Sequence, residues 1–366
     1  MVTAQAGLLK PPSHKYDIIQ VFRFVAALMV IILHSTFYAS ERLSSSFGLY
    51  NQGANGVRLF FVISGFVMIL SSENLKNKPG GYKIFAIKRI IRIVPIYWII
   101  TTYKLLVLIF ASTLILHAKL DALFILKSYF FIPALNIDGS FSPLLGVGWT
   151  LNFEMFFYLM FTIALALRIN TLAFLSLIFI PLSILSFYKN DHWPDARFYA
   201  NPIVLDFLYG MIIAKLILNG KKVTQAVAPI MITLGLIILF VPAVKQLGDI
   251  ASNTFVIGIA GFLVIYGAAS IENSCGSKMP AWLIYLGGAS YSLYLIHPIV
   301  APFSPTILKY LHIKLVYLSI IMSVVSAVIA GTLFYKYCEK PLTKFTTKLS
   351  ARLNLLPDNS KILVKE

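Results

Sequence analysis

A succession of ten apolar stretches constrains this chain more than any other feature of its sequence. Each stretch is about 17–25 residues long, the length that an α-helix needs to cross the hydrocarbon core of a bilayer. A backbone in lipid must satisfy its own hydrogen bonds, which an α-helix does within one segment. The sequence therefore predicts an all-α polytopic membrane helix bundle with about ten transmembrane helices. The expected spans cover residues 17–38, 54–71, 95–116, 146–167, 172–188, 202–218, 224–241, 254–271, 282–300 and 314–335.

The composition agrees with a membrane protein. Of 366 residues, 58% are hydrophobic and 12% are charged, about half the charged fraction of a soluble domain. The net charge of +17 would suit a nucleic-acid partner, but the placement of the charges argues against one. Twenty Lys and Arg residues fall on the side that holds both termini, eight fall on the other side, and three lie within spans. This bias predicts that both termini are cytoplasmic.

We expect a cytoplasmic tail over residues 1–16, a ten-span membrane domain over 17–336 and a basic cytoplasmic tail over 337–366. The first apolar stretch holds a charge and lacks a clear cleavage site, so it is expected to be retained as a span. The two cysteines, Cys275 and Cys338, lie far apart and form neither a metal-binding nor a disulfide pattern. We therefore expect no metal site.

A basic segment separates the second and third spans. It begins with a turn at residues 79–81 (Pro-Gly-Gly), and we expect a short surface helix that ends at Pro95, because proline breaks helices. Its basic residues are Lys83, Lys88, Arg89 and Arg92. One interpretation is attraction to anionic lipid headgroups, worth about 1 kcal/mol per charge. The other is a phosphate-binding rim for a nucleotide-bearing donor, because arginine binds phosphate bidentately.

The first span carries two ionisable residues, Arg23 and His34. A charge in hydrocarbon costs about 2.5–3.5 kcal/mol on insertion scales, so such residues usually face protein or water and have a function. Eleven residues make roughly three helical turns plus 20°, which places both side chains on one face, about 16 Å apart along the axis. One end of this face could hold an anion while the other carries out chemistry. The alternative is an arginine that reaches the interface and a buried, hydrogen-bonded histidine.

Polar residues of other spans recur at the expected depth of His34. Arg58, Ser64, Glu154 and His297 all fall in the outer half of their spans. Several such side chains at one depth are better explained by a shared polar cavity than by separate structural hydrogen bonds. For His297, which precedes a proline near the end of its span, we expect a capping or structural role.

Six short motifs run through nearly the whole chain. They are Arg23-x10-His34, Gly56-Val-Arg58-Leu-Phe-Phe-Val-Ile-Ser64-Gly65-Phe66, Arg89-Ile-Ile-Arg92-Ile-Val-Pro95, Trp149-Thr-Leu-x-x-Glu154, Ser290-Tyr-Ser-Leu-Tyr-Leu-Ile-His297-Pro298 and Glu339-Lys340-Pro341. In this order and at these spacings the chain resembles the acyltransferase-3 family, integral membrane enzymes that modify bacterial surface and exported polysaccharides. Arg58 departs from the pattern, since many relatives have Asp there. The chain looks like the stand-alone form without a fused extracytoplasmic domain.

The resemblance implies a multi-pass O-acyltransferase of the bacterial inner membrane. It would move an acetyl group, with succinyl as an alternative, from cytoplasmic acetyl-CoA to a hydroxyl of a cell-surface or exported polysaccharide or its lipid-linked precursor. His34 would act as a general base, since imidazole both takes and gives a proton, or as the nucleophile that carries the acyl group. Glu154 would orient a histidine as the third member of a triad does, or pair with Arg58.

The resemblance also implies the binding residues. The phosphates of acetyl-CoA would bind to Arg89, Arg92, Lys88 and Arg23. The acceptor would contact Trp149, Tyr291, Ser64 and Arg58, with packing or interface anchoring as the alternative for the two aromatics.

Two other classes of protein would also use buried charges. A transporter or channel needs a polar path, but the paired halves with broken helices typical of transporters are not evident in the sequence. A non-catalytic protein that senses or anchors a partner is the third class. The enzyme hypothesis predicts CoA release that requires both donor and acceptor, whereas a transporter predicts flux without covalent change.

Overall fold

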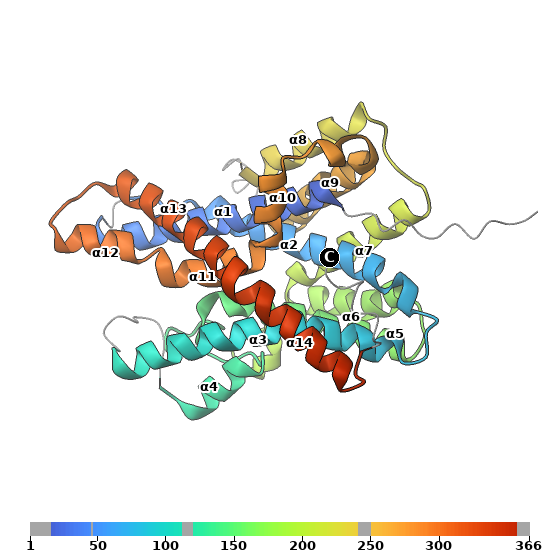
Figure 1. Cartoon of the computed structure of the whole chain (residues 1–366), viewed down its shortest axis with the longest axis horizontal. Helices are drawn as coiled ribbons and strands as arrows, with labels where there is room; N and C mark the ends of the chain where they lie inside the picture. The colour runs from blue at the N-terminus through green and yellow to red at the C-terminus, as the bar shows by residue number, and fades with distance from the viewer. Residues whose placement is uncertain (1–15, 45–46, 112–119, 241–249, 357–366) are drawn as a thin grey trace, which may run out of the picture.

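The computed structural model describes residues 16–44, 47–111, 120–240 and 250–356. Over these ranges the chain is built from helices joined by short connections, and it contains no β-strand (Figure 1). The helices are α1 (Asp17–Arg42), α2 (Asn55–Ser72), α3 (Gly81–Phe110), α4 (Ala122–Tyr129), α5 (Trp149–Ala166), α6 (Thr171–Leu185), α7 (Leu205–Leu218), α8 (Val227–Phe240), α9 (Ile250–Cys275), α10 (Ala281–Gly288), α11 (Ser290–Val300), α12 (Phe303–Tyr310), α13 (Val316–Phe334) and α14 (Lys340–Arg352). The all-α prediction is confirmed.

Each of the ten expected spans contains a helix, but the helices differ in length. Six helical segments in the described ranges are long and apolar enough to cross a membrane, and α10 with the helices after it would form a seventh span bent by 68°. Helices α6 and α8 are apolar but only 15 and 14 residues long. Ten spans and cytoplasmic termini therefore stay predictions. Residues 1–15 and 357–366 of the expected tails, and 112–116 of the expected third span, lie outside the described residues.

Contacts at the helix ends give the relative directions of neighbours. Glu272, near the end of α9, accepts hydrogen bonds from the backbone N–H groups of Asp17 (2.7 Å) and Ile18 (3.1 Å), and so caps the start of α1. At the other end of α1, Arg42 donates to the carbonyl of Pro302 at 2.7 Å, just beyond α11. Helix α1 thus runs antiparallel to α9 and parallel to α11, as the expected alternation of spans requires.

Helix α3 corrects one prediction. We expected a basic surface helix that ends at Pro95, but a single helix of 30 residues runs through the proline. Its buried residues recur every three or four positions on both sides of Pro95, from Phe85 through Arg89 and Ile93 to Ile100. Packing of this continuous stripe holds both halves in line, and neighbouring helices let a membrane helix tolerate the hydrogen bond that proline removes. The basic residues therefore belong to a helix that is long and apolar enough to span a membrane.

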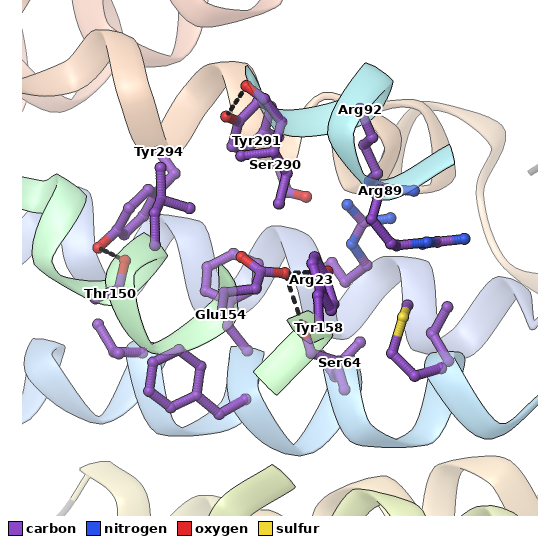
Figure 2. Close-up of a pocket in the computed structure, with 18 residues that line it drawn as sticks. Arg23, Ser64, Arg89, Arg92, Thr150, Glu154, Tyr158, Ser290, Tyr291 and Tyr294 are labelled. Carbon is purple, nitrogen blue, oxygen red and sulfur yellow. Dashed lines mark hydrogen bonds between the residues drawn. The ribbon is translucent and has the colours of Figure 1, made fainter. Parts of the chain in front are cut away.

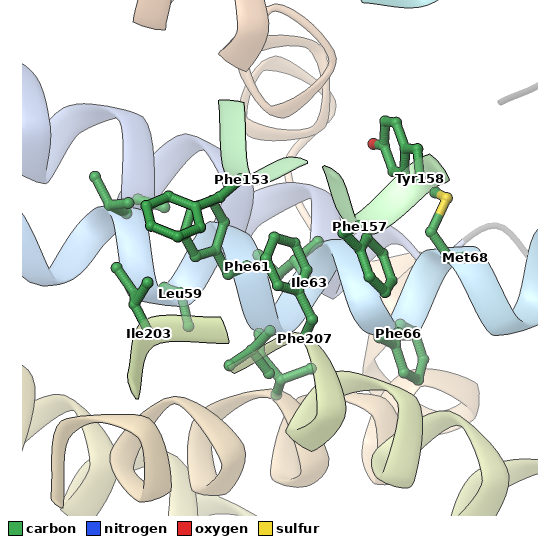
Figure 3. Packing of buried hydrophobic residues seen from close by; sticks show 14 of the residues in the cluster. Leu59, Phe61, Ile63, Phe66, Met68, Phe153, Phe157, Tyr158, Ile203 and Phe207 are labelled. Carbon is green, nitrogen blue, oxygen red and sulfur yellow. The ribbon is translucent and has the colours of Figure 1, made fainter. Parts of the chain in front are cut away.

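An aromatic core between α2, α5 and α7 holds the centre of the bundle (Figure 3). The ring of Phe207 on α7 stacks on Phe61 of α2, with centroids 4.5 Å apart, and on Phe157 of α5 at 4.3 Å. Such aromatic pairs contribute about 0.5–1.5 kcal/mol beyond their buried area. Helices α2 and α7 approach so closely that a Cβ atom at Gly65 would lie 2.0 Å from the carbonyl oxygen of Phe207. This packing positions the helices that carry Ser64 and Glu154.

A buried ion pair also joins α2 to α7. Arg58 donates from Nε and Nη2 to the two carboxylate oxygens of Asp206, at 2.5 and 2.7 Å. The Asp206 side chain is fully buried and Arg58 is 8% exposed. One of our two interpretations paired Glu154 with Arg58. In the structure the partner of Arg58 is Asp206 instead. The bidentate pair is a link between helices inside the bundle.

Candidate active site

A pocket with both polar and apolar lining residues lies among α1, α2, α3, α5 and α11 (Figure 2). The cavity volume is about 90 Å³, and further space in the pocket is open to solvent. Its polar lining residues are Arg23, Ser64, Arg89, Arg92, Thr150, Glu154, Tyr158, Ser290, Tyr291 and Tyr294. Five helices that are far apart in the sequence thus place their polar residues around one cavity.

Arginines gather at one end of this pocket. Arg89 and Arg92 lie one turn apart on α3 and share the pocket with Arg23 of α1. Arg89 is only 4% exposed, and its guanidinium carbon lies 5.6 Å from the ring centroid of Phe85. Arg23 donates to Oε1 of Gln20 at 3.0 Å. Guanidinium groups at this density inside a bundle could hold an anion with several charged oxygens.

Glu339 balances part of this positive charge. It ends the π-helical turn Tyr335–Glu339 between α13 and α14. Its carboxylate accepts a hydrogen bond from Ser292 and interacts electrostatically with Arg92 and Arg23. Single π-helical turns occur frequently at functional sites. Three arginines and one such carboxylate leave this end of the pocket with a positive charge.

Glu154 lies in the middle of the pocket (Figure 2). Its Oε1 atom accepts hydrogen bonds from the hydroxyl of Ser64 at 3.2 Å and from Tyr158, one turn further along α5. We expected Glu154 to contact either a histidine or Arg58. Its hydrogen-bond partners in the structure are instead two hydroxyl groups. Nearby, the Ser290 hydroxyl is buried and has no hydrogen-bond partner among the described residues. This part of the pocket can both accept and donate a hydrogen bond to a polar ligand.

Tyr294 lines the end of the pocket away from the arginines. Its hydroxyl is hydrogen-bonded to Thr150 at 2.9 Å and donates to the carbonyl of Val147 at 3.1 Å. The ring centroid of Tyr294 lies 5.9 Å from that of His297, which lies 4.9 Å from that of His34. Two imidazoles, one from α11 and one from α1, therefore lie side by side just beyond Tyr294.

This arrangement corrects our expectation of one cavity shared by Arg23 and His34. Arg23 lines the pocket, but His34 does not. Ring contacts lead from Tyr294, which lines the pocket, through His297 to His34, because α11 packs against α1. His34 is half-buried. The shared helix face is present, but aromatic side chains divide it.

Each histidine is held in a defined tautomer by its own helix. Nδ1 of His34 lies 3.0 Å from the carbonyl of Val30, and Nδ1 of His297 lies 3.2 Å from that of Leu293. A carbonyl oxygen can only accept, so we assign the proton of each neutral ring to Nδ1. Nε2 of each ring then carries the lone pair. His34 therefore presents a basic nitrogen, and Nε2 of the fully buried His297 has no hydrogen-bond partner in the described part of the chain.

Besides His34, three residues predicted for the site lie outside the lining of the pocket. Arg58 binds Asp206, Trp149 packs edge-on against Phe153 with ring centroids 6.0 Å apart, and Lys88 lies elsewhere on α3. Conversely, we had not assigned five polar residues that line the pocket or interact with its arginines. They are Thr150, Tyr158, Ser290, Tyr294 and Glu339. Each had a signal in the sequence: Tyr158 follows Glu154 by four residues, and the others stand inside the quoted motifs.

Comparisons with known proteins identify the family of the chain. The sequence profile of the acyltransferase domain matches residues 16–336, a range that contains every lining residue of the pocket. The chain is 33% identical over 270 residues to the exopolysaccharide production protein ExoZ of Rhizobium meliloti (strain 1021), which covers 71% of this chain and 80% of that protein. No solved structure matches the chain. With its helical fold, its six motifs and these two matches, the chain is an acyltransferase and belongs to the acyltransferase-3 family.

Proposed function

We propose that the chain is a membrane O-acyltransferase that moves an acetyl group from acetyl-CoA to a hydroxyl of an exported or cell-surface polysaccharide, or of its lipid-linked precursor. The observation that carries this proposal is the order of groups in and beside the pocket. Arginines lie at one end, Glu154 in the middle, and Tyr294 with two histidines at the other end. This order separates a place for an anion from a place for acid–base chemistry.

The arginine end suits the phosphates of the donor. Coenzyme A carries a 3′-phosphate and a pyrophosphate, and guanidinium groups bind such oxygens in pairs of parallel hydrogen bonds. In the proposed complex Arg23, Arg89 and Arg92 hold these groups, and the thioester arm extends past Glu154 toward Tyr294. Lys88 lies outside the pocket lining, so it is not part of this donor site.

His34 supplies the base. The acceptor hydroxyl is a weak nucleophile at neutral pH, and a positioned base contributes about 10²–10⁴-fold to the rate. Nε2 of His34 takes the hydroxyl proton, the oxygen bonds to the thioester carbon, and the carbon–sulfur bond breaks to release CoA thiolate. If His34 instead carries the acetyl group first, the same nitrogen attacks the thioester. Both routes need a lone pair on Nε2 of His34. The hydrogen bond between Nδ1 and the carbonyl of Val30 favours the tautomer that has it.

The printed name of ExoZ supports an exopolysaccharide as the acceptor. The acetyl group and the inner membrane as location rest on the family resemblance. Ser64 and Tyr291 line the pocket and remain the proposed substrate contacts. Arg58 and Trp149 lie outside its lining and are not included.

The first prediction concerns His34→Ala in the full chain, reconstituted in lipid nanodiscs. The assay supplies radiolabelled acetyl-CoA and polysaccharide extracted from cells that lack the gene. We expect the wild type to label the polysaccharide and release CoA only when both substrates are present. His34→Ala should lower labelling at least about 100-fold, because the base is lost.

Membrane insertion and thermal stability should stay unchanged in this variant, because His34 is half-buried and bonds only to its own helix. His192→Ala, in an exposed loop, is the matched control. Full labelling by His34→Ala would reject the assigned base. Wild-type protein that labels nothing would reject the reaction itself.

A further inference from the structure

Another pocket lies where four helices meet at one end of the bundle. Helices α2, α5 and α7 end at this pocket, and α6 begins there. Its cavity volume is about 300 Å³. Its charged lining residues are Lys76, Arg168 and Lys215, and none of the described residues that line it is a carboxylate. The acyl transfer proposed above assigns no role to this helix-end pocket.

The three cations come from segments that are far apart in the sequence. Lys76 follows α2, Arg168 follows α5, and Lys215 lies in the last turn of α7. Nζ of Lys215 donates to Oδ1 of Asn170 at 3.0 Å, and the same oxygen accepts hydrogen bonds from the first backbone N–H groups of α6. Asn170 therefore caps α6 and holds Lys215 at the pocket at the same time.

The charges around the helix-end pocket are not balanced within the described residues. Lys76 and Lys215 repel each other. The nearby carboxylate is that of Glu73, which is ion-paired with Lys76 and lies outside the lining. Three cations and one such carboxylate leave a positive charge. Because like charges at close range are unfavourable, an anion in the cavity would offset the repulsion.

The wall of the same pocket also contains a polar group without a partner. Thr171, the first residue of α6, lines the pocket and is 3% exposed. Its hydroxyl has no hydrogen-bond partner among the described residues. Buried polar groups of this kind are rare in folded proteins, and a hydroxyl can donate to an anionic oxygen. A ligand with several acceptor oxygens suits this wall and the cations together.

Exposed apolar side chains flank the cations and indicate which kind of anion fits. On the two sides of Arg168, Leu167 is 60% exposed and Ile169 is 44% exposed. Three residues after Lys215, Leu218 is 48% exposed. A free phosphate has no hydrocarbon to cover such side chains, whereas a phospholipid carries its phosphate next to its acyl chains. The ends of four apolar helices also mark the level at which lipid headgroups lie.

We propose that the helix-end pocket binds the phosphate of an anionic phospholipid, in the leaflet that we expect to be cytoplasmic. Lys76, Arg168 and Lys215 contact the phosphate, and the acyl chains lie along Leu167 and Ile169. Basic pockets between transmembrane helices on the cytoplasmic side are suited to anionic headgroups. The bound lipid joins the ends of α2, α5 and α7 to the start of α6. This site is separate from the pocket proposed for acyl transfer.

The experiment titrates phosphatidylglycerol into the full chain in a neutral detergent, and native mass spectrometry counts the lipids bound to each molecule. Phosphatidylcholine with the same acyl chains is the comparison lipid, because it has the phosphate but no net charge. We expect one preferred phosphatidylglycerol, and the double variant Lys76→Gln/Arg168→Gln should raise its apparent Kd at least about tenfold. Without lipid, this variant should melt within a few degrees of the wild type, because Lys76 is half-buried and Arg168 is exposed.

Lys221→Gln/Lys222→Gln is the matched control. It removes the same charge from an exposed loop that directly follows α7, outside the pocket lining. We expect its apparent Kd for phosphatidylglycerol to stay within about twofold of the wild-type value.

Three results would overturn the inference. The first is a wild type that binds phosphatidylcholine as tightly as phosphatidylglycerol. The second is an equal loss of affinity in both double variants, which would indicate general attraction to a basic surface. The third is inorganic phosphate that raises the melting temperature of wild type and control, but not of Lys76→Gln/Arg168→Gln, as much as phosphatidylglycerol does at equal concentration. That result would assign a free anion to the pocket. None of these measurements depends on acyl transfer, so failure of the proposed function would leave this inference unaffected.

Discussion

The role of Arg58 becomes clear only in the folded structure. The sequence marks it as a charge inside a span, but its partner, Asp206, lies 148 residues away on α7. The pair is buried, with two hydrogen bonds of 2.5 and 2.7 Å. A buried charge that loses its partner is left without compensation, which typically costs about 3–5 kcal/mol.

We therefore predict that Arg58→Met and Asp206→Leu each lower the melting temperature of the protein in detergent by several degrees. The double variant should be more stable than either single variant, because it leaves no unpaired charge. Differential scanning fluorimetry of the four proteins measures this coupling. Additive losses in the double variant would contradict a structural ion pair and reopen a functional role for Arg58.

Substitutions of Arg89 and Arg92 test whether acetyl-CoA binds at the arginine end of the pocket. A hydrogen bond to a charged group contributes about 1.5–3 kcal/mol, so Arg89→Gln or Arg92→Gln should raise KM for acetyl-CoA at least about tenfold. KM for the polysaccharide should change much less. Acetyl-dephospho-CoA, which lacks the 3′-phosphate, identifies the contact: the arginine that binds this phosphate should show little further loss with the analogue.

Lys83→Gln, an exposed residue of the same helix, is the control for this pair. A rise in KM for the acceptor alone would place the donor elsewhere.

Residue types, spacing and the family resemblance predicted that Arg23, Arg89, Arg92, Ser64, Glu154 and Tyr291 matter, and the structure brings all six to one pocket. The same reasoning did not find Asp206. Position along a span gives the depth of a side chain, but the rotation of each helix about its axis decides what it faces. That rotation depends on packing with helices far away in the sequence, which one sequence does not reveal.

At the scale of elements, the hydrophobic pattern located the helices well and their ends less well. Pro95 predicted a break in α3, yet the buried stripe on both sides of it continues without a change of phase. Local chemistry therefore favoured a helix end, and tertiary packing outweighed it. The turn before α3 was predicted correctly, because Gly80 adopts a left-handed conformation with φ of 71° that glycine adopts without strain.

The crossing of α2 and α7 provides the prediction at this scale. A Cβ atom at Gly65 would lie 2.0 Å from the carbonyl oxygen of Phe207, and one at Gly210 would lie 1.9 Å from that of Val62. Both contacts are with backbone, so the helices must separate to admit a methyl group. We expect Gly65→Ala and Gly210→Ala to cost about 1–3 kcal/mol, seen as a lower melting temperature in detergent.

Gly48→Ala is the control, because a Cβ atom there would have nothing within 4 Å. Melting temperatures of Gly65→Ala and Gly210→Ala equal to that of the control would contradict this close packing.

For the whole molecule, the sequence predicted an all-α fold, which the described residues confirm. The number of spans is harder to predict from the sequence, because α6, α7 and α8 contain only 14 or 15 residues each. Helices of this length need thinning of the bilayer or flanking residues that reach the interface. Sequence hydropathy alone does not distinguish a short span from a buried helix.

The distribution of Lys and Arg predicts how the bundle lies in the membrane. Green fluorescent protein fused after residue 220 or at the C-terminus should fluoresce, because both points are expected in the cytoplasm. Alkaline phosphatase fused after residue 195 should be active, since that loop is expected outside. Reversed reporter activities would invert the topology and place the arginine end of the pocket on the side without acetyl-CoA.

The unbroken course of α3 has one more consequence. A helix of 30 residues is about 45 Å long, more than the roughly 30 Å of hydrocarbon that it has to cross. The surplus of about 15 Å matches the distance from Gly81 to Arg92, the twelfth residue of the helix, so the basic segment can project from the hydrocarbon while the apolar part crosses it. A donor docked at these arginines would keep its charged head at the bilayer surface and extend its acyl arm into the bundle. Its thioester would then be shielded from bulk solvent, which would spare the activated acyl group from wasteful hydrolysis until a sugar arrives.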